Sequence, residues 1–164
     1  MAKIIPNQNT WIGYIPEGGI DSVDLIPTDA ELTAEGAVNL TPFIISLNAA
    51  SQGNIVPTPS LDSLFETSIL GTSQASFSGD FYRDDTVDTA WDAFDRGDAG
   101  YFVISRFGGT NPGEVPVAGD KVEVWPVRIV SKTMANMANN TVETFTLTCA
   151  VPVEPNEDAT VIAD

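Results

Sequence analysis

The chain has 164 residues, 43% of them hydrophobic, and carries a formal net charge of −16 with no histidine. This hydrophobic fraction is too high for a disordered acidic chain, and the length suffices for one domain with its own core. A negative field over the surface repels nucleic-acid phosphates and anionic membranes, so the composition argues against tight binding to either.

The residues needed for common catalytic sites are missing. Without histidine, neither a Ser-His-Asp nor a Cys-His arrangement can form, and histidine-liganded zinc is excluded as well. Neither G-x-x-x-x-G-K-[ST] nor G-x-G-x-x-G occurs. We therefore expect no enzyme activity, no catalytic residue, no metal site and no cofactor.

Targeting signals are absent too. The first residues lack the apolar segment of a secretion signal, and no apolar run approaches the ~20 residues that span a bilayer. Cys149 is the only cysteine, so no intramolecular disulfide can form. We expect the chain to be made and folded in a cytoplasm, without membrane contact.

The first 47 residues are punctuated by proline and glycine. Residues 1–30 combine these breakers with scattered apolar side chains, which predicts an N-terminal arm or a pair of short strands. Such an arm packs either on a neighbouring molecule or on its own domain. Residues 37–47 predict a strand, or two strands broken at Pro42.

Residues 48–71 predict a long connection with little regular structure. A short helical turn is expected after Ser60, where Leu61 and Phe65 lie four residues apart. Connections of this length are usually functional or interfacial, so we interpret residues 48–71 as an interface loop. Together with the arm, the loop supplies five interface candidates: Trp11, Ile12, Pro57, Leu61 and Phe65.

Residues 72–82 alternate between polar and apolar side chains, as in a half-buried strand. Ser76 and Ser78 fall on the polar face, and Phe77 and Phe81 fall on the apolar face. The strand therefore presents small hydroxyl groups to its surroundings.

A helix is predicted from about residue 85 to residue 96, ended by Gly97. Val87, Trp91 and Phe94 lie on one stripe at helical spacing, and we expect them to anchor the helix on the sheet. A second stripe is acidic, and it faces either solvent or a lumen or a neighbouring subunit. Its members are Asp85, Asp88, Asp92 and Asp95.

Three further strands are predicted at residues 101–107, 121–131 and 141–151, followed by a flexible acidic tail at 152–164. In the last strand Thr144, Thr146 and Thr148 alternate with inward apolar residues that include Cys149. The pattern predicts a single, mainly β domain over residues 1–164: a β-sandwich or partial barrel with one flanking α-helix.

Several segments together resemble the major tail (tail tube) proteins of long-tailed, siphovirus-type phages, in particular those that infect actinobacteria. They run from Phe77 to Asp85 (FSGDFYRDD), from Asp88 to Trp91 (DTAW) and from Arg96 to Tyr101 (RGDAGY). Agreement extends upstream to GNIVPTP, which begins at Gly53, and downstream to GDKVEVWP, which begins at Gly119. Each motif alone is weak, and their order and spacing carry the resemblance.

The resemblance implies a structural virion protein. Six copies would form a ring whose inner β-barrel is continuous across subunits, and stacked rings would form the tube through which DNA passes. It also implies contacts with a tape-measure protein, a tail terminator and distal tail proteins, and assembly in the host cytoplasm. Five small polar residues suit the lining of such a bore, or simply face solvent on a monomer: Ser76, Ser78, Thr144, Thr146 and Thr148.

Three alternatives remain at this stage. A carbohydrate-binding β-sandwich would use exposed aromatic rings, with Trp11, Tyr14 and Trp125 as candidates. A hydrolase would use a carboxylate pair chosen from Asp80, Asp84 and Asp85. A head-decoration protein would share the structural role without forming a tube.

Overall fold

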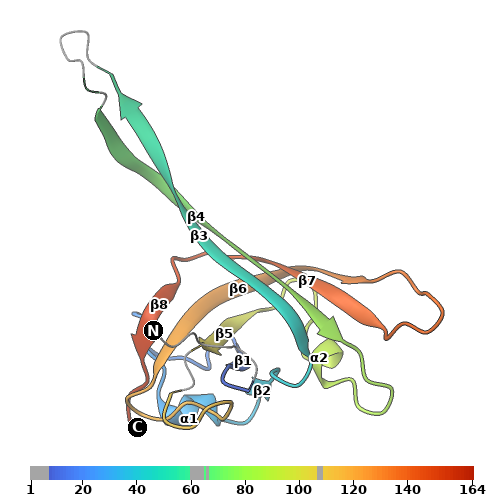
Figure 1. The fold of residues 1–164 in the computed structure, drawn as a ribbon. Coiled ribbons are helices and arrows are strands. Elements are labelled where there is room, and N and C mark those ends of the chain that lie inside the picture. The colour runs from blue at the N-terminus through green and yellow to red at the C-terminus, as the bar shows by residue number, and fades with distance from the viewer. Residues whose placement is uncertain (1–7, 60–64, 66, 107–108) are drawn as a thin grey trace.

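The computed structural model describes residues 8–59, 65, 67–106 and 109–164, and its main element is one antiparallel β-sheet (Figure 1). The sheet has eight strands: seven follow the order β2-β1-β5-β6-β7-β4-β3, and the eighth, β8, pairs with β6. The strands are β1 (Trp11–Pro16), β2 (Val38–Asn39), β3 (Ile44–Thr58), β4 (Thr67–Tyr82), β5 (Ala99–Ser105), β6 (Lys121–Met134), β7 (Thr144–Ala150) and β8 (Asn156–Thr160).

The sheet curls on itself until strands that are not neighbours in the sheet face each other. Phe77 of β4 lies 4.5 Å from Phe102 of β5, measured between ring centroids, although β6 and β7 separate these strands in the sheet. Phe94 and Tyr14 complete the same aromatic core, with centroids 5.1 Å apart. The predicted mainly β partial barrel is confirmed, as one curled sheet.

Strands β1 and β5, and strand β6 as far as Val127, are buried on both faces. In β1, Tyr14 points into the aromatic core, whereas Trp11 and Ile15 point to a second apolar cluster on the opposite face. Residues 20–37 cover this second face and contribute Leu32 of the short helix α1 (Asp29–Leu32). Burial on both faces explains why the sequence of β5 is almost continuously apolar.

Helix α1 was not predicted from the sequence. It begins with a capping box, in which the Thr28 hydroxyl accepts from the Glu31 N–H and the Glu31 carboxylate accepts from the Thr28 N–H. The T-x-x-E pattern at residues 28–31 is the sequence signal that could have identified it.

The predicted helix over residues 85–96 is wrong in length. Helix α2 spans only Thr89–Asp92. The Lys132 ammonium donates hydrogen bonds to the carbonyls of Trp91 (2.9 Å) and Phe94 (2.6 Å). Because these carbonyls are satisfied by Lys132, they need no further helical turn. Phe94 is fully buried and Trp91 is partly buried, so both anchor the segment as predicted. Val87 lies before the helix with 65% of its surface exposed, and its predicted anchoring role is wrong.

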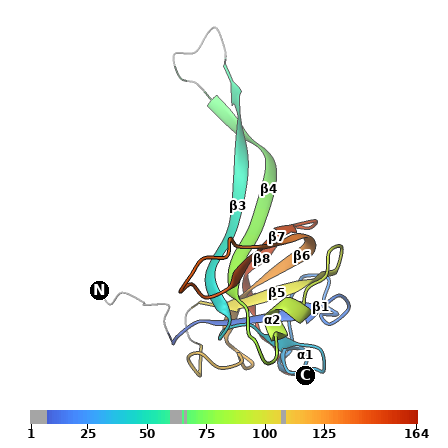
Figure 2. The same ribbon diagram turned by 90° about the vertical axis from the view of Figure 1, so that its right-hand side faces the viewer.

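The predicted loop at residues 48–71 is instead most of a long β-hairpin. Strands β3 and β4 pair from Ile44↔Phe81 out to Thr58↔Thr67, with register shifts near Ile44 and Gly53. Figures 1 and 2 show this hairpin leaving the curled sheet and projecting well beyond it. The sequence lacks polar-apolar alternation here because neither face of the outer hairpin is buried. The helical turn expected after Ser60 lies outside the described residues.

The predicted flexible tail at residues 152–164 is also wrong. Strand β8 pairs with β6 from Lys121↔Thr160 to Val124↔Asn156, and Val161 beyond it is buried. Ala159 and Val161 face the second apolar cluster, whereas Glu157 and Asp158 face solvent. The exposed carboxylates of Glu157 and Asp158 gave this segment the composition of a tail, although residues 158–161 alternate between exposed and buried like a strand.

A buried carboxylate, Asp120, holds the loop that precedes β6. It accepts from the Thr110 N–H (2.8 Å), the Thr110 hydroxyl (2.7 Å) and the Val117 N–H (3.0 Å). Burial by itself raises the pKa of Asp120, but the hydrogen bonds from Thr110 and Val117 outweigh it and hold this pKa below its usual value.

Asp120→Asn is therefore expected to reduce the free energy of unfolding by about 1 to 3 kcal/mol at pH 7. The amide offers one acceptor atom in place of two, so one donor near it loses its partner. Because the folded-state pKa is lowered, the stabilisation is present above pH ~4 and is lost as the pH falls through the folded pKa. Urea denaturation at pH 7 and pH 3 measures this effect. The free energies of unfolding of the variant and the parent should differ less at pH 3 than at pH 7.

Asp158→Asn serves as the control for this prediction, because the Asp158 side chain is 76% exposed and pairs with Lys121 on the surface. It should change the stability by less than about 1 kcal/mol at either pH. Equal effects of the two substitutions at pH 7 would contradict a special role for Asp120.

Candidate assembly surfaces

The outer face of the β6-β7-β4-β3 part of the sheet is lined with small hydroxyl residues. Strand register places Thr148 beside Ser131 and Ser78, and Thr146 beside Thr133 and Asp80. All five predicted lumen residues lie on this face of the adjacent strands β4 and β7: Ser76, Ser78, Thr144, Thr146 and Thr148. We call it the hydroxyl face.

Among the described residues, two charged ones lie on the hydroxyl face. Asp80 accepts hydrogen bonds from the hydroxyls of Thr146 (2.6 Å) and Ser46 (2.8 Å), and these bonds lower its pKa. Arg128 is exposed, aligned with Ala150 in the register, and has no ion pair among the described residues. One carboxylate and one guanidinium leave the face close to neutral.

The acidity of the chain is concentrated on other elements. Carboxylates cluster in the layer that covers β1-β5-β6, in the segment around α2, and near the C-terminus. These acids are Glu17, Asp21, Asp24, Asp29, Glu31 and Glu35; Asp84, Asp85, Asp88, Asp92, Asp95 and Asp98; and Glu154, Glu157, Asp158 and Asp164. The net charge of −16 is thus distributed unevenly in space, although it is spread along the sequence.

The outer part of the β3-β4 hairpin exposes large apolar side chains. Four of them lie opposite each other in two register pairs, Ile55↔Leu70 and Val56↔Ile69, and their exposed fractions range from 42% to 79%. No charged residue occurs between Glu35 and Asp62 in the sequence. An exposed, uncharged, apolar β-ribbon is typical of a protein–protein contact, because isolated edges of this kind aggregate.

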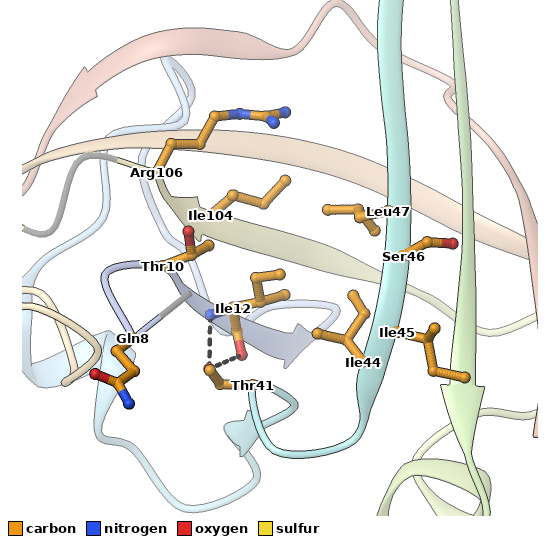
Figure 3. Close-up of a pocket in the computed structure, with 10 residues that line it drawn as sticks. All are labelled: Gln8, Thr10, Ile12, Thr41, Ile44, Ile45, Ser46, Leu47, Ile104 and Arg106. Atoms are coloured by element: carbon orange, nitrogen blue, oxygen red, sulfur yellow. Dashed lines mark hydrogen bonds between the residues drawn. The ribbon is translucent and has the colours of Figure 1, made fainter. Parts of the chain in front are cut away.

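The two ends of the curled sheet do not close, and a hollow of about 520 Å³ lies between them. Figure 3 shows Ile12 and Ile104 on one side of this hollow and Ile44 and Leu47 of β3 on the other. The Thr41 hydroxyl bridges this region to β1, accepting from the Ile12 N–H at 2.9 Å. Because β3 is the last strand of the sheet, no described strand pairs with its outer edge.

The predicted interface residues have mixed outcomes. Trp11 and Ile12 are 2% and 5% exposed within the subunit's own core, so their prediction as interface residues is wrong. They belong to β1, which pairs with β5 inside the sheet. Pro57 lies in the hairpin and Phe65 is 75% exposed, so both stay candidates, and Leu61 lies outside the described residues.

Sequence reasoning missed the four apolar residues of the outer hairpin. Their signal was a pair of uncharged stretches, residues 36–61 with Ile55 and Val56 and residues 67–79 with Ile69 and Leu70, which is unusual in a chain with 23 acidic residues. Adjacent apolar residues such as Ile55 and Val56 do not alternate, so the period-2 pattern could not identify them.

The structure argues against the carbohydrate-binding alternative. Trp11, Tyr14 and Trp125 are 2%, 3% and 1% exposed, so none of them offers a ring face for a sugar.

The carboxylate alternative also lacks support. The pKa of Asp80 is lowered by hydrogen bonds from Thr146 and Ser46, whereas a general acid needs a raised one. Within the described part of the chain, no group of three or more Cys, Asp or Glu side chains is arranged to hold a metal ion. None of the described helices is long and apolar enough to span a membrane.

Comparison with known proteins identifies the family of the chain. The family model described as phage tail tube protein matches residues 1–164, the whole chain. The chain belongs to the phage tail tube protein family. It is accordingly a structural protein of a phage tail, and the virion is its location.

Solved structures share the tail tube fold at low sequence identity. A chain of the anti-feeding prophage baseplate, determined with 6-fold symmetry, superposes with a TM-score of 0.58 at 9% identity, covering 94% of this chain and 95% of that one. A chain from the tail of an empty gene transfer agent particle, with C6 symmetry, superposes with a TM-score of 0.57 at 18% identity, covering 95% of this chain and 100% of that one. A chain from the native gene transfer agent virion superposes with a TM-score of 0.52 at 16% identity, covering 76% of this chain and 89% of that one. None of the curated proteins matches this chain.

Proposed function

We propose that six copies of this tail tube protein close into a ring and that rings stack into the tube that conducts DNA. The single observation that carries the proposal is the hydroxyl face. It is a continuous, nearly neutral surface over four adjacent strands of an otherwise acidic subunit. The sixfold symmetry of the anti-feeding prophage and gene transfer agent assemblies supports the ring size.

Ring closure would use the two sides of this four-stranded region. One side is the outer edge of β3, which no described strand occupies. The other is the far end of β6, because β5 pairs with β6 only as far as Arg128 and leaves residues 130–134 open on that side. Backbone pairing between these two edges in neighbouring copies is a heterologous contact, which forms a closed ring when the rotation allows.

The bore in this proposal is lined with hydroxyl groups. Serine and threonine side chains offer DNA no large apolar surface and few cations, so DNA can pass without specific binding. The lining of this bore is close to neutral although the subunit is acidic, because most of the acids lie on other faces of the subunit.

The proposal includes further partners and a cellular setting. Contacts with a tape-measure protein, a tail terminator and distal tail proteins belong to it, as do a non-enzymatic role and assembly in the cytoplasm of the bacterial host. The motif order from Gly53 to Pro126 supports an actinobacterial host.

Electron microscopy of the concentrated protein, alone and after co-expression with its tape-measure protein, tests the proposal. We expect sixfold rings or tubes in at least one of the two samples. Monomers in both samples, with the far-ultraviolet circular dichroism of a folded β-protein, would overturn it.

A further inference from the structure

Arg128 brings to the hydroxyl face a cation that no described carboxylate of the subunit pairs with. Its side chain is exposed, and none of the ion pairs among the described residues includes it. Four other cations each lie beside a carboxylate: Arg83, Arg106, Lys121 and Lys132. A guanidinium group has N–H donors and no acceptor, so Arg128 is equipped to bind an anion from outside the subunit.

The residues next to Arg128 leave its guanidinium group uncovered. Arg128 lies between Ala99 of β5 and Ala150 of β7 in the strand register, and Ser76 of β4 follows Ala150. Residues directly opposite each other in an antiparallel pair share a face, so these three side chains lie beside Arg128 on the hydroxyl face. All three are too short to cover a guanidinium group at the end of its methylene chain. An anion that approaches the face can therefore reach Arg128 without displacing them.

The carboxylate of the hydroxyl face lies too far away to neutralise Arg128. Asp80 is aligned with Thr146 of β7. Arg128 is aligned with Ala150, four residues further along β7, which corresponds to about 13 Å. This separation exceeds the Debye length of about 8 Å at physiological ionic strength, so the two charges are largely screened from each other. The face is close to neutral in total, but it is locally positive at Arg128.

We infer that Arg128 contacts the phosphate groups of duplex DNA in the bore, without sequence specificity. The inference rests on the proposed tube and specifies how the tube touches the DNA that it conducts. Six copies would place six guanidinium groups at one level of each ring, and stacked rings would repeat this level along the tube. Because a planar guanidinium can donate to two phosphate oxygens at once, arginine suits a phosphate better than lysine does.

The surroundings of Arg128 favour a phosphate over the carboxylate of a protein partner. Proteins contact DNA phosphates with arginine and lysine together with serine and threonine hydroxyls, and Ser76 and Thr148 carry hydroxyls on the same face. A protein interface has an apolar core, for which the alanine and serine neighbours of Arg128 provide little area. A single contact per subunit also stays weak, since each contacted phosphate changes the slope of log K against log salt by only roughly 0.9. DNA can therefore be held briefly and still move on.

Tubes formed by the protein alone and verified by electron microscopy test the inference. The probe is a short fluorescent linear duplex, and the measured quantity is the fraction that sediments with the tubes at ~50 mM and ~200 mM salt. Arg128→Gln removes the cation, and Arg128→Lys keeps it. Variant subunits that do not assemble alone are mixed with an equal amount of parent subunits.

Lys121→Gln is the matched control, because it removes one positive charge from the same strand. Lys121 lies at the start of β6, in the part that pairs with β8, and its side chain is 63% exposed and pairs with Asp158. A closed circular duplex serves as the second control, since it has no end that can enter a bore.

We expect the parent tubes to retain the linear duplex at ~50 mM salt and to release most of it at ~200 mM salt. Retention at the lower salt should fall by about fivefold or more in Arg128→Gln tubes and stay within about twofold of the parent in Lys121→Gln tubes. Arg128→Lys tubes should lie between these values. The circular duplex should not sediment with any of the tubes.

Equal retention by the parent and Arg128→Gln tubes, or none by the parent, would show that Arg128 is not a phosphate contact, while the tube itself stands. Equal retention of the circular and linear duplexes would place the contact on the outer surface and would also overturn the inference. If the unsubstituted protein forms no tubes, alone or with the tape-measure protein, the proposed function and the inference both fail.

If tubes form only together with the tape-measure protein, the same variants are compared in purified virions. Arg128→Gln should then speed DNA ejection at ~50 mM salt and weaken its dependence on salt. Unchanged ejection would overturn the inference, and tails of altered length would then assign Arg128 to the tape-measure protein.

Discussion

Replacing Phe94 with alanine is expected to lower the free energy of unfolding by about 3 to 5 kcal/mol. The Phe94 ring is fully buried, and its centroid lies 5.1 Å from that of Tyr14, 5.7 Å from that of Phe81 and 5.8 Å from that of Phe102. These partners come from β1, β4 and β5, so the ring connects the segment around α2 to strands on both sides of the curled sheet. Its removal leaves a cavity that no single strand can close.

Val87→Ala is the matched control, since both substitutions shorten an apolar side chain of the same segment. Val87 is 65% exposed, so we expect its truncation to change stability by less than about 0.5 kcal/mol. Urea denaturation followed by tryptophan fluorescence measures both. A loss of less than about 1 kcal/mol for Phe94→Ala would show that the segment is not anchored by this ring.

Thr148→Lys is expected to leave the subunit folded while infectivity falls by about tenfold or more. Thr148 is exposed on the hydroxyl face, where the strand register places it beside Ser78 and Ser131. In the proposed ring, six added ammonium groups per layer would attract the phosphates of passing DNA and slow its release. The plaque titre and the rate of DNA ejection from purified virions measure this effect.

Val23→Lys adds the same charge to the layer that covers the other side of the sheet, and it should leave the titre near that of the parent. Thermal unfolding should give nearly the same midpoint for both variants and the parent, because both sites are exposed. A normal titre for Thr148→Lys in virions with intact tails would place Thr148 outside the bore.

The half-buried strands were predictable because they carry their pattern locally. In β7, Phe145, Leu147 and Cys149 are buried and the threonines between them face outward, as alternation predicts. The inner half of β4 follows the same rule at Phe77 and Phe81. The hydroxyl side of both strands could therefore be predicted from the sequence, and the register then placed these residues side by side.

The hairpin and the C-terminal strand were not predictable in this way. Strand β3 is specified by its pairing with β4, a contact between residues far apart in the sequence, and both faces of its outer part are exposed. Strand β8 carries its acids on the solvent side, so its composition resembles a tail although Ala159 is buried. In both segments the pairing partner determines the structure, and single-segment patterns do not encode the partner.

Local patterns in the sequence were enough to assign the chemical class of this protein. The absence of histidine, the single cysteine, the strand alternation and the motif order sufficed for a mainly β structural protein of the tail tube family. The positions of the charge and of the apolar surface depend on how the strands pair and could not be read from local patterns. Side chains distant in the sequence become neighbours through strand pairing, so a neutral hydroxyl face and a hairpin apolar on both sides arise within a chain of net charge −16.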